Sequence, residues 1–128
     1  MSKFMTVIID FLSYEAAAST NSPDDAVKIK ESVSETSITE LSRIQRAIAD
    51  AVVDQVVAVP SSEAEYLMIF SDQDISIKLN GSSDAIALEV NTAGTKCPVF
   101  FARADITALT VSNASGSTAN VDFVLINV

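Results

Sequence analysis

The chain has 128 residues, of which 48% are hydrophobic and 20% charged, and its formal net charge is −9. This length is typical of one domain, and a core of that size needs no metal or disulfide. The apolar fraction excludes global disorder, and the acidic charge disfavours direct contact with the phosphates of DNA or RNA. Cys97 is the only cysteine, which excludes an intrachain disulfide, and we expect it to be a small buried core residue.

Residues 4–14 are predicted to form a long strand and not a signal peptide. Thr6 and Asp10 interrupt the apolar run, whereas the hydrophobic region of a signal peptide is continuous. No segment approaches the roughly 20 apolar residues needed to span a bilayer. We therefore expect no membrane contact, and a chain that stays in the cytoplasm where it is made until it assembles.

The region between residues 27 and 59 has mixed signals. Apolar and polar residues alternate over 27–33, which predicts a short strand. The secondary structure of residues 38–49 remains open, and both a short helix and a strand are possible. Apolar residues recur there at helical spacing beside a capping-box pattern, which favours the helix. The recurring residues are Ile38, Leu41, Ile44, Ile48 and Val52. The β-branched run 52–59, which ends at Pro60, predicts another strand.

After Pro60, short apolar runs alternate with turn signals. The predicted strands are 66–70, 75–79, 85–90, 99–101, 106–112 and 121–128. Asn80 and Gly81 predict a type I′ turn, because both residues tolerate positive φ. So many short strands indicate a mainly β fold, an antiparallel β-sandwich of jelly-roll or immunoglobulin-like topology. We expect residues 41–128 to form the sandwich core, and residues 1–40 to form an N-terminal strand and extended arm, in the same domain or as an assembly arm.

Strands near both chain ends are apolar on both faces, although a strand of an isolated sandwich should have one polar face. In the last strand the two alternating sets are Val121, Phe123 and Leu125, and Val124, Ile126 and Val128. A second apolar face predicts cover by a neighbouring subunit. The candidate oligomer or capsid interface consists of Val7, Ile8, Ile9, Phe11, Leu12, Val124, Ile126 and Val128.

The residue types that carry most enzymatic chemistry are missing or isolated. The chain has no histidine and three glycines, which excludes a histidine-based acid–base or metal centre and a glycine-rich phosphate loop. Acidic pairs at 24–25 and at Asp72 and Asp74 could donate oxygens to calcium, but neither supplies the roughly six to eight ligands required. We expect them to be turn residues that bond local backbone. The sequence thus predicts no enzyme, no cofactor and no metal site.

Several segments resemble a group of small tailed-phage virion proteins. The resemblance lies mainly in residues 65–81 (EYLMIFSDQDISIKLNG) and 105–113 (DITALTVSN), with the apolar strand 98–101 (PVFF) between them. Residues 41–45 (LSRIQ) and 54–55 also look like that group, in which they belong to strands, and this favours β structure at 41–48. The resemblance covers the chain from residue 41 onward. It implies a β-sandwich subunit present in many copies on a virion, and the group has no catalytic residues to carry over.

The resemblance and the apolar strand faces lead to one main hypothesis. We expect a virion structural protein, in the first place a capsid decoration (cement) protein that stabilises a phage head through oligomeric β-sandwich contacts. Its expected partners are further copies of itself, with a trimer as the first candidate, and the major capsid protein or another virion protein. No nucleic-acid or membrane partner is expected, and the expected location is the virion, assembled in the bacterial cytoplasm.

Other hypotheses remain open at this point. One is a phage head–tail or tail component. Another is a glycan-binding β-sandwich module, which would need an aromatic platform or a calcium site. A hydrolase would need two acidic side chains buried together with raised pKa values.

Overall fold

The computed structural model of the chain describes residues 3–13, 27–60 and 63–128, with side chains described for 3–9, 30–60 and 63–128. These residues form ten strands and no helix. The chain divides into two compact units, Met1–Ile38 and Thr39–Val128.

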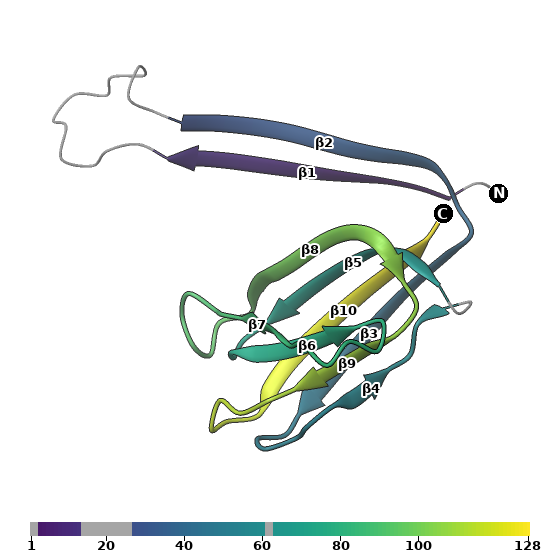
Figure 1. Cartoon of the computed structure of the whole chain (residues 1–128). Helices are drawn as coiled ribbons and strands as arrows, with labels where there is room; N and C mark the ends of the chain where they lie inside the picture. Colours follow the sequence, from purple (N-terminus) through teal and green to yellow (C-terminus); the bar gives the residue numbers. More distant parts are fainter. Residues whose placement is uncertain (1–2, 14–26, 61–62) are drawn as a thin grey trace, which may run out of the picture. The chain divides into compact units, whose positions relative to one another are not determined.

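The second unit is an antiparallel β-sandwich of two four-stranded sheets (Figure 1). One sheet has the order β3-β10-β5-β8 and the other has the order β4-β9-β6-β7. The strands are β3 (Glu40–Ile48), β4 (Gln55–Val57), β5 (Ala64–Ser71), β6 (Ile75–Leu79), β7 (Ile86–Leu88), β8 (Cys97–Ile106), β9 (Leu109–Ser112) and β10 (Ala119–Asn127). The mainly β fold and the antiparallel sandwich predicted from the sequence are confirmed.

The strand order identifies the sandwich as a jelly roll. Apart from the β6–β7 hairpin, the chain changes sheet at every connection. The first strand, β3, pairs with the last, β10, and not with its successor β4. An immunoglobulin fold would instead keep its first two strands in one sheet. Of the two topologies that the sequence left open, the jelly roll is therefore the correct one.

The core lies between the two sheets and is built from aliphatic residues and one phenylalanine. Every strand of the sandwich contributes to it. Its fully buried members include Ile48, Val57, Leu67, Ile69, Ile77, Ile106, Leu109, Val111, Phe123 and Leu125. In β10 the residues Val121, Phe123 and Leu125 point into this core, so Val124 and Ile126 point away from it, as the alternation of a strand requires. The predicted division of this strand into two apolar faces is confirmed.

The helical alternative at 38–49 is wrong. Residues 40–48 form the edge strand β3, which pairs with β10 from Glu40 opposite Asn127 to Ile48 opposite Ala119. The apolar residues whose spacing resembles a helix lie on both faces of the strand. Ile44 and Ile48 face the core, while Leu41 faces the opposite side. Strand pairing and burial in the sheet therefore outweigh a weak local helical pattern.

The strand predicted at 106–112 is two strands in different sheets. β8 ends at Ile106 and β9 begins at Leu109, and the chain crosses between the sheets at Thr107 and Ala108. Asn80 holds this crossing: its Oδ1 accepts hydrogen bonds from Thr107 N at 2.7 Å and from Ala108 N at 3.4 Å. Its Nδ2 donates to the carbonyl oxygen of Asp105 at 2.7 Å. A side chain from a distant turn thus ends the strand, which no local pattern indicates.

Cys97 does not lie in the core. It is half-buried at the first position of β8, and it pairs with Ser71 at the end of the neighbouring strand β5. The prediction of a buried core cysteine is therefore wrong at this position.

The first unit is a two-stranded antiparallel hairpin. It consists of β1 (Lys3–Ser13) and β2 (Val27–Ile38). The strand predicted at 27–33 continues through the Ser-, Thr- and Glu-rich segment to Ile38. Pairing with β1 explains the extension, since a partner strand supplies the backbone hydrogen bonds that side-chain propensity alone would not secure.

The type I′ turn predicted at Asn80 and Gly81 is confirmed. Both residues have positive φ, 54° and 71°, and Ser82 N donates to the carbonyl oxygen of Leu79 at 2.9 Å. No atom lies within 4 Å of the position of an added Cβ at Gly81. Steric crowding is therefore absent there, and the backbone conformation alone demands glycine or asparagine.

Replacing Gly81 by alanine should lower the free energy of unfolding by about 1–2 kcal/mol, the cost of a left-handed conformation for a residue with Cβ. Gly81→Asn is the matched control and should cost less, because asparagine tolerates this conformation. Urea unfolding of both variants checks the difference. Equal stability of the alanine variant and the parent chain would contradict the explanation.

Candidate interaction surfaces

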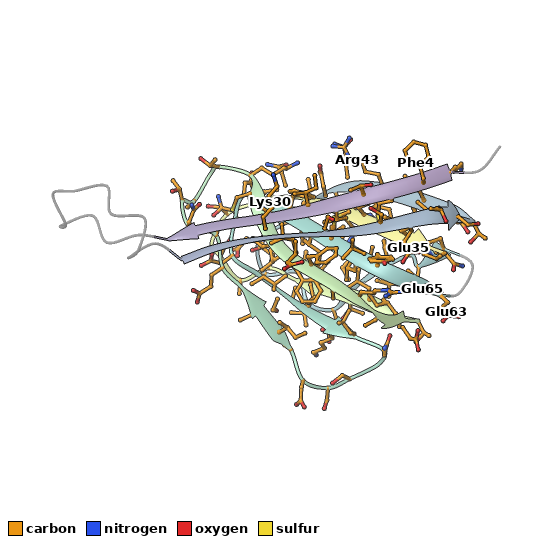
Figure 2. The ribbon with its side chains drawn as sticks, turned by 90° about the horizontal axis from the view of Figure 1, so that it is seen from above. Phe4, Lys30, Glu35, Arg43, Glu63 and Glu65 are labelled. Carbon is orange, nitrogen blue, oxygen red and sulfur yellow. The ribbon has the colours of Figure 1, made fainter. Side chains whose placement is uncertain are left out.

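The hairpin has one face that is mainly apolar. The register places Val7 opposite Val33, Ile9 opposite Glu31 and Met5 opposite Glu35, and opposite residues share a face. This apolar hairpin face therefore combines Met5, Val7, Ile9 and Val33 with the two carboxylates of Glu31 and Glu35. Figure 2 shows Glu35 on β2, with Phe4 at the start of β1.

The other hairpin face is mostly polar. Thr6 lies opposite Ser34, and their hydroxyl oxygens are 3.2 Å apart. Ile8 lies opposite Ser32 and is 61% exposed. Of the predicted interface residues, Val7 and Ile9 thus share the apolar face while Ile8 lies on the polar one. Phe11 and Leu12 belong to β1, but their side chains lie outside the described part of the chain.

The outward side of the β3-β10-β5-β8 sheet carries a second apolar surface, here named the outer face. Met68 of β5 lies opposite both Val124 of β10 and Phe101 of β8. One pair further along, Tyr66 lies opposite Ile126 and Arg103. The outer face therefore contains Tyr66, Met68, Phe70, Phe101, Val124 and Ile126. Two of the predicted interface residues, Val124 and Ile126, lie on it, and Val128 follows the end of β10.

Aromatic and cationic side chains meet at one end of the outer face. The rings of Tyr66 and Phe101 have centroids 6.3 Å apart at an interplanar angle of 32°. The guanidinium carbon of Arg103 lies 5.4 Å from the centroid of the Tyr66 ring, within the range of a cation–π interaction. This end of the outer face is closely packed, since Tyr66 and Ile126 are 0% and 1% exposed, whereas Met68, Phe101 and Val124 are half-buried.

An ion cluster lies beside the apolar residues of the outer face. Asp122 of β10 is 5% exposed, and its two carboxylate oxygens each accept a hydrogen bond at 2.8 Å, one from Arg43 Nη2 and one from Lys96 Nζ. These three residues line a hollow of about 510 Å³ together with Met68, Phe70 and Val124. The cluster satisfies a nearly buried charge, because both oxygens have a cationic partner.

The two cations lower the pKa of Asp122. The hydrogen bond from Lys96 contributes most and that from Arg43 next, and together they outweigh the opposing effect of burial, so the pKa lies below the 3.8 of an unperturbed aspartate. A carboxylate with a lower pKa in the folded state stabilises the fold above its unfolded pKa. This contribution is lost as the pH falls through the folded pKa.

Asp122→Asn should therefore flatten the acid side of the stability profile. Above about pH 4 the variant should be less stable than the parent chain by about 1–2 kcal/mol, a value reduced by the solvent exposure of both cations. The difference should shrink as the pH falls from about 4 towards 2. Urea midpoints measured across this range test it, and an unchanged difference at low pH would contradict the role of the charge.

Carboxylates at one end of the sandwich bond the backbone of neighbouring loops. Asp50 Oδ1 accepts from Gly116 N at 2.9 Å, and Asp74 Oδ1 accepts from Val90 N at 2.9 Å. Asp72 binds the backbone N and side-chain Nδ2 of Asn120 at 2.7 and 2.8 Å. These aspartates fasten segments that are distant in sequence, among them the start of β10 at Asn120, whereas bonds to local backbone were expected for Asp72 and Asp74.

No group of three or more His, Cys, Asp or Glu side chains that could hold a metal is found among the described residues. The acidic pair at 24–25 lies outside the described residues. The hydrogen bonds of Asp50, Asp72 and Asp74 show these carboxylates as acceptors of backbone N–H groups.

Sequence reasoning missed the ion cluster and most of the outer face. Arg43, Lys96 and Asp122 are far apart in the chain, and only the pairing of β3 with β10 brings the first and last together. The signal for the outer face was present in residues 66–70, where Tyr66, Met68 and Phe70 alternate with core residues. The sequence predicts a strand at 66–70, but it does not assign the outward face of that strand.

The described part of the chain contains no helix that is long and apolar enough to cross a bilayer. Comparisons of the chain with protein-family models, curated proteins and solved structures found no match.

Proposed function

We propose that the chain is a structural protein of a tailed-phage virion, and that it acts as a capsid decoration protein. The observation that carries the proposal is a jelly-roll sheet, β3-β10-β5-β8, that is apolar on both sides. A sandwich that functions alone has a polar outer side, and a second apolar side favours a subunit of an assembly. The jelly roll recurs among viral capsid proteins, which agrees with the resemblance of residues 41–128 to phage virion proteins.

The hairpin gives independent support to an assembling subunit. A two-stranded hairpin is marginally stable by itself in water, and β1 and β2 form a sheet of two strands with no further strand among the described residues of their unit. Its apolar face includes Ile9, which is 46% exposed. Burial against another subunit would stabilise the hairpin by about 25 cal/mol for each Å² of apolar surface covered.

The proposed partners are other copies of the chain and the major capsid protein or another virion protein. In a particle the many copies would strengthen individually weak contacts through multivalency. The proposal assigns no catalytic role and no cofactor. It agrees with the structural use of Asp50, Asp72 and Asp74 as acceptors for backbone N–H groups.

Immunogold electron microscopy tests the location. Antibody raised against the full chain is applied to intact phage particles from bacteria that carry the gene, and particles from a gene deletion serve as the control. Gold on the heads is the expected result, and purified chain added to deletion particles should restore both the label and the heat resistance of the heads. Label at the neck or tail would replace decoration by a head–tail or tail role. Particles without label would overturn the proposal.

A further inference from the structure

We propose that strand β1 pairs with β1 of a second copy of the chain, antiparallel and centred on Ile8, so that two hairpins form one four-stranded sheet. The inference rests on the proposed function in taking the chain to be an assembling subunit. It adds the identity of one partner and names the edge at which the two copies meet.

One edge of β1 has no partner strand among the described residues. β1 pairs there with β2 alone, so about half of the backbone N–H and C=O groups along its eleven residues point away from β2. Several side chains of the strand are exposed, namely Phe4 to 80%, Ile8 to 61% and Ile9 to 46%. A long, apolar edge strand of this kind is a template for pairing with another chain.

The two edges of the hairpin differ in how well they are protected against such pairing. β2 carries four charged residues, Lys28, Lys30, Glu31 and Glu35. It also holds the extra residue of the register shift between Lys3 and Met5, and both charges and bulges keep natural edge strands from pairing. β1 has no charged residue between positions 3 and 10. The edge of β1 is therefore the one at which the hairpin can extend.

The sequence of β1, KFMTVIIDFLS, is symmetric about Ile8 in its polar and apolar positions. If two copies pair antiparallel with Ile8 opposite Ile8, Lys3 lies opposite Ser13 and Thr6 opposite Asp10, and every apolar residue lies opposite an apolar one. All eleven residues of each strand are then paired, and no like charges are opposite each other. A self-complementary edge of this kind fits a two-fold axis, the commonest symmetry of soluble oligomers.

Pairing through β1 would also give the hairpin a stable apolar sheet. Opposite residues share a face, so the apolar hairpin faces of both copies, with Met5, Val7, Ile9 and Val33 in each, would lie on the same side of the four strands. A hairpin alone is marginally stable, whereas a sheet of three or more strands with an apolar face can be stable in its own right. The second copy thus supplies what the described residues of one hairpin lack.

Charges placed at the axis test the pairing in the full-length chain. Ile8→Lys puts two ammonium groups opposite each other, and Ile8→Glu puts two carboxylates there. Each variant alone should raise the Kd of self-association by about tenfold or more, measured by sedimentation velocity. An equimolar mixture should recover most of the wild-type association, because each lysine can then lie opposite a glutamate. Ile8 is exposed and lies on the mostly polar hairpin face, so a single copy should tolerate both changes.

Ser32→Lys is the matched control. Ser32 is exposed and lies opposite Ile8 on the same hairpin face, but it belongs to β2. In the proposed sheet the two copies of residue 32 are three strand spacings apart, about 14 Å, which exceeds the Debye length of about 8 Å at physiological ionic strength. This variant should leave Kd unchanged.

A cross-link tests the register independently. In a Cys97→Ser background, Ile8→Cys should form an intermolecular disulfide on mild oxidation, because opposite residues of an antiparallel pair lie within the reach of a disulfide. Ser32→Cys in the same background should not. A wild-type chain that is a monomer throughout would overturn the proposal. So would an unchanged Kd in both Ile8 variants, or a mixture that stays as weak as its components.

The outcome is separable from that of the virion test. A monomeric chain that still labels phage heads would end the pairing proposal and leave the proposed function intact. Recovered association on mixing, without any label on particles, would establish the pairing of β1 strands and remove the virion role.

Discussion

Replacement of Phe123 by alanine should lower the free energy of unfolding by about 3–5 kcal/mol, the usual cost of removing a buried ring. Phe123 is fully buried in β10, a central strand of the β3-β10-β5-β8 sheet. It lies opposite Ile44 on one side and Ile69 on the other. The surrounding core residues are close-packed, and such side chains refill only part of the space that a removed ring leaves.

Such a loss is a large part of the roughly 5–15 kcal/mol that stabilises a typical domain. Val124→Ala, on the same strand but facing away from the core, is the control and should cost no more than about 1.5 kcal/mol. Equilibrium unfolding in urea, followed by circular dichroism, measures both variants. Equal losses would show that the two faces of β10 contribute alike, which would contradict the assignment of one core between the two sheets.

The parts of the fold that the sequence predicted are those in which burial and local conformation agree. Val121, Phe123 and Leu125 alternate with outward residues, and a period of two determines the facing of a strand wherever it is paired. Asn80 and Gly81 impose their turn through positive φ, which is a local property. In both cases the information lies within a few residues of the place where it acts.

The misassigned parts depend on partners that are distant in sequence. Residues 40–48 contain a helical spacing of isoleucine and leucine, but the pairing of β3 with the C-terminal strand decides their structure. The break between β8 and β9 depends on the side chain of Asn80. No single-sequence pattern contains these contacts, because they arise only when the whole sandwich closes.

The candidate surfaces also could be predicted only where they depend on residues close together in the sequence. Val124 and Ile126 were predicted from alternation alone, and they do lie on the side of β10 that faces away from the core. The charges that surround them could not be predicted, since Arg43, Lys96 and Asp122 become neighbours only through the pairing of β10 and the loop before β8. The direction in which an apolar side chain points follows from the alternation within one strand. An ion cluster forms only after several strands have paired.

Replacing Asn113 by alanine should destabilise the sandwich by about 2–4 kcal/mol, since buried groups would lose their hydrogen-bond partners. Asn113 is 1% exposed and follows β9. Its Nδ2 donates to the carbonyl oxygens of Ile48 and Ser117 at 2.8 and 2.7 Å, and its Oδ1 accepts from Ser115 N at 3.0 Å. Its backbone N donates to the carbonyl oxygen of Val52 at 2.9 Å. One side chain thus joins the end of β3 to the loop that leads into β10.

Two further variants separate the hydrogen bonds from the volume of the side chain. Asn113→Asp keeps the shape but directs a negative charge at two carbonyl oxygens, so it should be at least as destabilising as alanine at pH 7. Asn91→Ala, in an exposed turn, is the control and should change stability by no more than about 0.5 kcal/mol. Urea unfolding ranks the three variants. An aspartate variant as stable as the parent chain would show that the donors of Asn113 are dispensable, and the backbone bonds of Asn113 to Val52 and of Gly116 to Asp50 would then suffice to hold the loop.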